Sequence, residues 1–279
     1  MKRLPVPFLV CITLCNCLAV TDPPEPINCT LEQGFSYAYN LQFEQAQLQF
    51  TGWQKEHPED PLGPVSEAAG LIFSEFDRLG VLESEFFEKD SSFTSHSKLS
   101  PDPAVKKRFD DALQRAEGAA QMKLKQDPKN QDALFTLTLA NGLRADYSEM
   151  IEKKNLDALS YTKQADGWAE KLLAVSPDYY DAYVATGFSK YVIGSLSMPM
   201  RWILRLGGYS GDKKGGIHDL ELSATKGHYL APFARLLLAI AYLRQNQRAE
   251  ARELLVGLQK EFPANPLFPK EIAKIDAQK

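Results

Sequence analysis

Small and apolar residues recur along the chain at a fixed distance from prolines. Four times an Ala is followed by an apolar or small residue four positions later, and by a Pro eight positions after that. The four sets are Ala46, Phe50 and Pro58; Ala116, Ala120 and Pro128; Ala165, Ala169 and Pro177; and Ala251, Leu255 and Pro263. Residues four apart share one face of a helix, and a proline cannot continue that helix. The pattern therefore predicts four helices that pack closely against a neighbour and end just before a proline.

The segments between these sets also have helical patterns. Val65 to Leu79 carries apolar residues at helical spacing, and Asp102-Pro103 is a favourable helix start. Phe268 to Lys279 predicts a short last helix with a polar outer face. Asp132 and Asp181 each follow a repeat proline by four residues, where a carboxylate favours a helix start. Because no stretch alternates convincingly over the length of a strand, the predicted fold class is all-α.

The first and the last of the four sets are preceded by a second recognisable helix. Gly34 and Tyr37 stand twelve and nine residues before Ala46, and Ala239 and Tyr242 stand at the same distances before Ala251. This spacing resembles the tetratricopeptide repeat (TPR), a 34-residue unit of two antiparallel helices. The resemblance implies a TPR-like antiparallel helix-pair solenoid with irregular insertions, since the prolines do not keep a 34-residue period.

The resemblance also gives the domain organisation. The best repeats cover 28–61 and 234–266, and partial repeats around 105–135 and 155–190 match mainly in their second helix. Stacked pairs of this kind form a curved superhelix with a concave groove, in which proteins and peptides are commonly bound. We therefore expect one TPR-like domain over 20–279 that acts as a scaffold for a protein or peptide partner.

The N-terminus has the layout of a secretory signal peptide over residues 1–19. A basic start, Met1 to Arg3, precedes an apolar run that ends at Ala19, and a polar, proline-rich stretch follows. The predicted localisation is therefore secreted or periplasmic. Two alternatives would tether the protein to a membrane through this segment: the apolar run could stay uncleaved, or Cys17 could carry a lipid, although Asn16 is unusual directly before such a cysteine. A lipidated chain would resemble the small envelope-anchored TPR subunits of assembly machines.

Composition and motifs provide no sign of catalysis, metal or cofactor. The formal net charge of −4 argues against a nucleic-acid surface. No histidine has zinc-ligand spacing, and the Gly207–Gly216 stretch has neither the phosphate-loop order nor the dinucleotide-binding spacing. We predict that the protein is not an enzyme and needs no cofactor. The alternative from another class is a helical-toroid enzyme whose acidic site has no sequence signature, and a third is a purely structural helical layer.

One local cluster is a candidate binding site. Cations and aromatic residues gather within fourteen positions of an otherwise acidic protein: Arg201, Trp202, Arg205, Tyr209, Lys213 and Lys214. Arg, Trp and Tyr are enriched at protein interfaces, so the cluster can be interpreted as the contact site for an acidic partner. In the competing interpretation, which we favour from the sequence, Trp202 packs in the core and the cations extend to water.

The same region has a second resemblance. Gly207 and Gly208 predict the end of a helix that begins near Met198, and Asp212 predicts the cap of the next helix. The G-x-x-G-D order followed by a leucine-patterned helix loosely resembles a helix-loop-helix in the TPR family of mitochondrial outer-membrane inclusion-body-clearance proteins. That similarity covers the C-terminal third.

Overall fold

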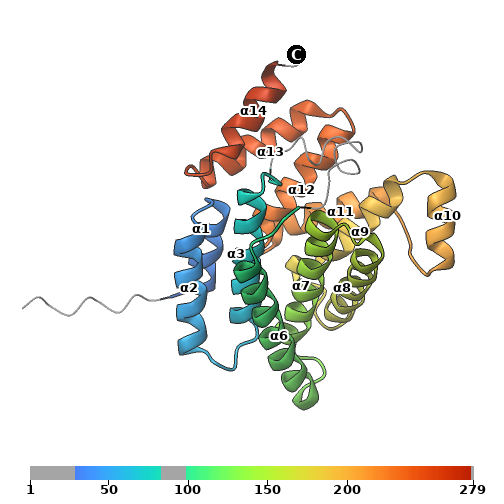
Figure 1. The fold of residues 1–279 in the computed structure, drawn as a ribbon. Coiled ribbons are helices and arrows are strands. Elements are labelled where there is room, and N and C mark those ends of the chain that lie inside the picture. Colours follow the sequence, from blue (N-terminus) through green and yellow to red (C-terminus); the bar gives the residue numbers. More distant parts are fainter. Residues whose placement is uncertain (1–28, 83–98, 278–279) are drawn as a thin grey trace, which may run out of the picture.

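A computed structural model describes residues 29–82 and 99–277, and these residues form twelve α-helices and no strand (Figure 1). The helices are α1 (Leu31–Tyr39), α2 (Phe43–Glu56), α3 (Leu62–Arg78), α6 (Pro103–Gln126), α7 (Gln131–Asp146), α8 (Asn155–Val175), α9 (Tyr183–Ser195), α10 (Met198–Leu206), α11 (Lys213–Lys226), α12 (Ala231–Arg244), α13 (Arg248–Glu261) and α14 (Leu267–Ala277). The all-α prediction is confirmed. The predicted signal peptide and Cys17 lie outside the described residues.

The described helices pack together in pairs that follow the order of the chain. The pairs are α1 with α2, α3 with α6, α7 with α8, α9 with α11, and α12 with α13. Each pair packs on the next in sequence order, and α14 covers the exposed side of α13 as a terminal helix. The described chain is therefore a TPR-like helix-pair solenoid, as predicted. Helix α10 belongs to none of these pairs.

The four Ala-Pro sets occupy equivalent places in four of the pairs. All four alanines are buried, and so are the residues that follow them by four positions. Each helix closes with the same 2.8 Å hydrogen bond, in which the amide directly before the proline donates to the carbonyl four residues earlier: His57 to Trp53, Asp127 to Lys123, Ser176 to Leu172, and Phe262 to Leu258. The proline follows because it needs no amide partner at that place.

The remaining pair contains a fifth repeat that the Ala-Pro pattern misses. In α11, Gly216, Leu220 and His228 have the spacing of Ala46, Phe50 and Pro58, and the Gly227 amide makes the same 2.8 Å bond to Ser223. A Cβ added to Gly216 would lie 2.5 Å from the Tyr191 amide nitrogen of α9. The two helices meet so closely that glycine replaces the alanine, and His228 replaces the proline.

Helix boundaries predicted from caps are largely confirmed. The Asp102 side chain accepts from the Ala104 amide at 2.8 Å and begins α6, and Asp132 lies in the first turn of α7. Asp181 also lies at a helix start, in the first turn of the short 3-10 helix Tyr180–Ala182 that leads directly into α9. Its buried carboxylate accepts from three amides at the start of α12, those of His228, Tyr229 and Leu230, at 2.8 to 3.0 Å. Asp181 thus caps a helix far along the chain.

The first and the last repeats touch each other. The Tyr39 hydroxyl at the end of α1 donates to the Tyr229 carbonyl at 2.8 Å, and the Asn265 side-chain amide donates to the Tyr39 carbonyl at 2.8 Å. The rings of Phe35 and Tyr229 lie 5.2 Å apart, as do those of Tyr39 and Phe262. The solenoid is therefore wound tightly enough for α1 to contact the segments around α12 and α13.

This closure places α3 and α7 in the interior. Twelve of the 17 residues of α3 are buried, and one hydrophobic cluster extends from Leu31 in α1 to Ala234 in α12. Phe73 of α3 meets Phe233 of α12 with ring centroids 5.8 Å apart. The inner side of the solenoid is thus occupied by core side chains.

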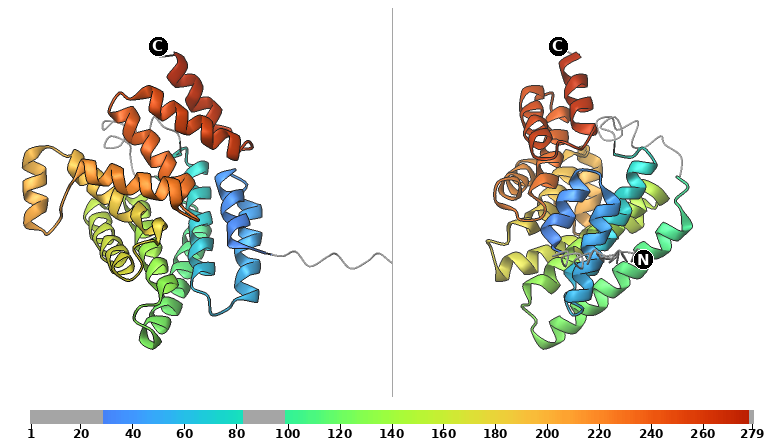
Figure 2. Two further views of the ribbon diagram at one scale, coloured as in Figure 1. Left: turned by 180° about the vertical axis from the view of Figure 1, so that it is seen from behind. Right: turned by 90° about the vertical axis from the view of Figure 1, so that its left-hand side faces the viewer.

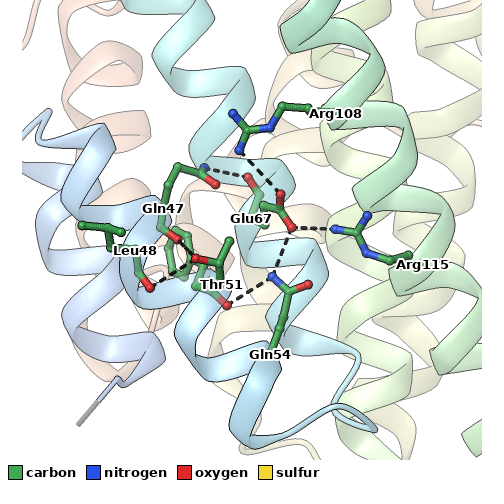
Figure 3. A network of polar contacts seen from close by, with 8 residues as sticks. Gln47, Leu48, Thr51, Gln54, Glu67, Arg108 and Arg115 are labelled. Atoms are coloured by element: carbon green, nitrogen blue, oxygen red, sulfur yellow. Dashed lines mark hydrogen bonds and ion pairs between the residues drawn. The ribbon is translucent and has the colours of Figure 1, made fainter. Parts of the chain in front are cut away.

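The buried carboxylate of Glu67 joins helices α2, α3 and α6. Glu67 of α3 accepts from Arg115 of α6 at 2.6 Å and from Gln54 of α2 at 3.1 Å, and Arg108 approaches it at 3.7 Å (Figure 3). The Gln47 side chain donates to the backbone carbonyl of Glu67 at 3.0 Å. The network compensates the cost of burying one charge by giving it several donors.

Replacing this carboxylate should destabilise the fold more than replacing its outermost donor. We expect Glu67→Gln to lower the free energy of unfolding by about 1–3 kcal/mol, because it removes the charge that Arg115 and Gln54 bind. Arg108→Gln is the matched control, and its loss should stay below about 1 kcal/mol, since Arg108 is half-exposed and more distant. Urea unfolding monitored by circular dichroism measures both. Equal losses would contradict a central role for Glu67.

The fifth repeat can be tested at its glycine. Gly216→Ala should lower the free energy of unfolding by about 2–3 kcal/mol, because the new Cβ forces α9 and α11 apart. Gly257→Ala in α13 is the control, since a Cβ added there would have nothing within 4 Å; it should raise stability by about 0.5–1 kcal/mol. Thermal unfolding of both variants decides the matter, and an unchanged Gly216→Ala variant would refute the close approach.

Candidate functional site

Helix α10 interrupts the pair formed by α9 and α11 and stands away from the body of the molecule (Figures 1 and 2). Its limits follow from local sequence as predicted. Pro199 lies in its first turn, and Gly208, with φ of +79°, follows its end. Asp212 then begins α11 by accepting from the Lys214 and Gly215 amides, each at 3.1 Å. The helix is thus defined at both ends by its own residues.

The base of this excursion is closed by backbone contact. The Asp212 amide donates to the Lys190 carbonyl at 3.1 Å, which joins the segment before α11 to α9. A Cβ on Gly211 would lie 2.5 Å from the Gly194 amide nitrogen, so the two arms approach at a point where only glycine fits. The pinched base makes the excursion a defined branch of the fold.

No residue of α10 is buried. Five of its apolar side chains are exposed, to 73% at Met198, 66% at Trp202, 72% at Leu206, 57% at Ile203 and 46% at Met200, while Leu204 is half-buried. The interpretation in which Trp202 packs in the core is therefore wrong. The reason is tertiary: no neighbouring helix covers this side of α10 in the described chain, so these five side chains have nothing to pack against. Exposed apolar surface of this extent is characteristic of interaction sites, which makes α10 the candidate site.

The side chains of α10 form an ordered surface. Met198, Trp202 and Leu206 follow one another at four-residue steps and make one apolar row along the helix. Arg201 and Arg205 lie beside this row on one edge, because each precedes a member of the row by one residue. Ile203 and Met200 continue the apolar surface past the other edge. We call these seven residues the α10 face.

The α10 face is free of carboxylates. Residues 182–211 contain no Asp or Glu, although the whole chain has 36. In the described part of the chain, no acidic partner is found for Arg201 or Arg205, and the contact seen for Arg201 is with the Met198 sulfur at 3.7 Å. The cations of α10 are therefore available to a partner.

The structure separates the six predicted site residues into three groups. Arg201, Trp202 and Arg205 lie together on α10. Tyr209 instead supports the branch, because its hydroxyl donates to the Leu159 carbonyl of α8 at 3.3 Å while Lys163 lies over its ring at 5.0 Å.

Lys213 and Lys214 form the third group, in the first turn of α11. The Lys213 ammonium lies 5.9 Å from the centre of the Tyr191 ring, and the Lys214 amide takes part in the helix cap. Sequence reasoning missed Met198, Met200, Ile203 and Leu206 as members of the site. The absence of carboxylates from 182–211 was the signal that could have found them.

A second polar cluster lies between α8, α9 and α11. Ser189 donates to Asp166 at 2.8 Å, and Thr186 and Lys190 donate to Asp219 at 2.8 and 2.7 Å. Burial raises the pKa of Asp166 to about 6, and one of its carboxylate oxygens has no hydrogen-bond partner in the described structure. Because the hydroxyls are bound to carboxylates and no histidine is among them, the cluster has the arrangement of a structural network joining three helices.

A hollow of about 750 Å³ lies along α13 and α14, lined by Arg248, Ala249, Arg252, Glu253, Val256, Gly257, Lys260 and Ile275. Arg252 in its wall is held by Asp276 at 2.9 Å. Within 29–82 and 99–277 no group of histidine, cysteine and acidic residues is arranged to hold a metal ion. None of the helices in these ranges has the length and apolar composition needed to cross a bilayer.

Comparison with known proteins adds little to these observations. No protein-family model and no curated protein matches the sequence. Among solved structures, the chain is similar to the crystal structure of a thermophilic TPR protein from Thermus thermophilus, with a TM-score of 0.46 and 16% sequence identity. That similarity covers 88% of this chain and 96% of the other. The TPR-like assignment rests on the chain's own helix pairs and repeated turns.

The half-buried Asp166 should make the stability of the fold depend on pH. The pKa of its carboxyl group in the folded state, about 6, is above the ordinary value of 3.8. Ionisation of Asp166 therefore lowers the free energy of unfolding. This loss grows between about pH 4 and pH 6 and reaches its full size above pH 6. We expect Asp166→Asn to raise the free energy of unfolding by about 1–2 kcal/mol at pH 7.5 and by nothing at pH 4. The exposed Glu253→Gln is the control and should change it by less than about 0.5 kcal/mol. If the gain in the free energy of unfolding were the same at pH 4 as at pH 7.5, it would not come from ionisation of Asp166.

Proposed function

We propose that this protein is an exported TPR-like scaffold that binds a protein partner, and that the α10 face is its contact surface. The observation that carries the proposal is the exposure of Met198, Met200, Trp202, Ile203 and Leu206 on a branch whose base is pinched. Trp, Met and Arg are the residue types enriched at protein interfaces, and a central Trp is a frequent hot spot. The proposal assigns no catalytic step.

Covering this surface would contribute favourable free energy to a contact with a partner. A tryptophan buries about 150–250 Å² when fully covered, so covering the exposed two thirds of Trp202 removes roughly 100–150 Å² from water. At about 25 cal/mol per Å² this contributes roughly 3 kcal/mol. Met198, Ile203 and Leu206 add to it. A short helix of this kind fits the lower range of interface sizes, which is typical of reversible complexes.

The interior of the solenoid supports the same assignment. TPR-like scaffolds commonly bind partners in the concave groove, but here α3 and α7 are covered by neighbouring helices, and core side chains occupy the inner side. The exposed branch has an uncovered apolar surface, and the interior of the described solenoid has none. Export is part of the proposal because of the basic and apolar pattern of residues 1–19, with cleavage after Ala19 or lipid attachment at Cys17 as the two routes.

Site-directed crosslinking tests the proposal. A photoreactive phenylalanine analogue placed at Ile203 should trap one protein in the native host, whereas the same probe at Met122, which is 55% exposed on α6, should not. The trapped protein is then purified and titrated against the wild-type chain and Trp202→Ala. We expect at least a tenfold loss of affinity with an unchanged circular dichroism spectrum, since Trp202 makes little contact with the body.

Two results would contradict the proposed function. The first is equal crosslinking from Ile203 and Met122, which would indicate random encounters. The second is a purified partner that binds wild type and Trp202→Ala with the same affinity, which would place its binding site elsewhere on the molecule.

A further inference from the structure

The partner of the α10 face can be described by its chemistry. Resting on the proposed function, we infer that it presents an amphipathic helix whose apolar row is bordered on one edge by at least two carboxylates. These carboxylates pair with Arg201 and Arg205, while the apolar row covers Met198, Trp202 and Leu206. The argument depends on the charge, the spacing and the one-sided arrangement of the α10 face.

Charge is the first step. In a chain of net charge −4, the branch and its flanks form a 30-residue segment, 182–211, whose ionisable side chains are Lys190, Arg201, Arg205 and the aromatic hydroxyls. Lys190 is paired with Asp219 at 2.7 Å, so Arg201 and Arg205 are the positive charges of this segment that a partner can contact. Covering an unpaired arginine with an apolar partner costs free energy, so a partner that covers the α10 face must supply carboxylates.

Spacing is the second step. Arg201 and Arg205 are four residues apart on α10, and a rise of about 1.5 Å per residue separates them by about 6 Å along the axis. Two carboxylates on a partner helix at positions i and i+4 have the same separation. A guanidinium donates two parallel hydrogen bonds to such a carboxylate, which fixes orientation as well as adding affinity. A matching helix therefore meets both arginines at once.

The arrangement around α10 favours a protein over a membrane. Amphipathic helices that lie in a lipid surface carry cations over a broad polar face. On α10 the arginines occupy one edge of the row, and Ile203 and Met200 make the opposite edge apolar. A lipid surface has the same composition on both sides of an embedded helix, whereas a folded partner can be acidic on one side and apolar on the other. The one-sided face therefore matches a protein surface.

The experiment is a selection of helical peptides displayed on phage from a randomised library. The baits are the full chain and its charge-reversed variant Arg201→Glu/Arg205→Glu, which keeps the apolar row. Trp202→Ala serves to remove peptides that bind elsewhere. We expect wild type to enrich peptides with apolar residues three and four apart and Asp or Glu at i and i+4 on one edge. The reversed variant should enrich Lys or Arg at the same positions.

Affinity measurements complete the test. The best acidic peptide should bind Arg201→Gln/Arg205→Gln at least tenfold more weakly than wild type, and its affinity for wild type should fall with added salt. A parallel sedimentation assay with vesicles of equal parts phosphatidylcholine and phosphatidylglycerol should show no dependence on Trp202. All variants change exposed side chains, so circular dichroism should confirm the same helical content.

The outcomes separate this inference from the proposed function. Trp202-dependent peptides that lack carboxylates, or that ignore charge reversal, would overturn the acidic partner while a protein-binding α10 face stands. Trp202-dependent binding to the anionic vesicles with no enriched peptide would identify a lipid surface and overturn both. A selection in which no peptide depends on Trp202 would likewise overturn both.

Discussion

The structure depends on the close approach of paired helices at one small residue in each pair. Ala46, Ala116, Ala165 and Ala251 fill this place in four pairs, and Gly216 fills it in the fifth, where α9 passes so near that even a Cβ does not fit. Because each helix then ends with the same amide-to-carbonyl bond and turns at the next residue, the following helix begins at a fixed position. Repetition of this one contact winds the chain into a solenoid, and the angle it imposes decides whether the ends meet.

In this protein the ends do meet. Tyr39 and Phe35 of the first repeat reach Tyr229 and Phe262, and Asp181 fixes the start of α12 by accepting three amides with its buried carboxylate. Burial raises the pKa of Asp181 while the amides oppose the rise, so the contact is a balance between desolvation and hydrogen bonding. The cost of such buried polar groups is offset by the core that closure creates around α3 and α7. A consequence is that the inner side of the solenoid is filled by core side chains.

The sequence predicted the parts of this fold that depend on local chemistry. The four Ala-Pro helices, the Asp102 and Asp212 caps and the end of α10 at Gly207 and Gly208 all follow from residues within one turn of the feature they determine. The fifth repeat was not predicted because Gly216 and His228 occupy the positions of the alanine and the proline in the pattern. Sequence alone favours a buried Trp202 because Met200-Arg201-Trp202-Ile203 has the same local pattern as a buried helix. Whether such a helix is covered depends on a neighbour that no local pattern specifies, and in the described chain that neighbour is missing.

The close approach that builds the solenoid also explains why α10 is exposed. Helices α9 and α11 touch at Gly216, and their connection is pinched again where Gly211 meets Gly194, so a seventeen-residue link has no room between them. The link therefore extends away from the body of the molecule, and the apolar residues that it carries are exposed. In the described structure the link is anchored at its base. Tyr209 donates to the Leu159 carbonyl of α8, and Lys163 of α8 donates to the Gly207 carbonyl. The Asp212 amide donates to the Lys190 carbonyl of α9. The packing of the solenoid therefore constrains the base of the branch and leaves the α10 face unconstrained. The side chains of the α10 face can therefore change with little effect on the stability of the repeats.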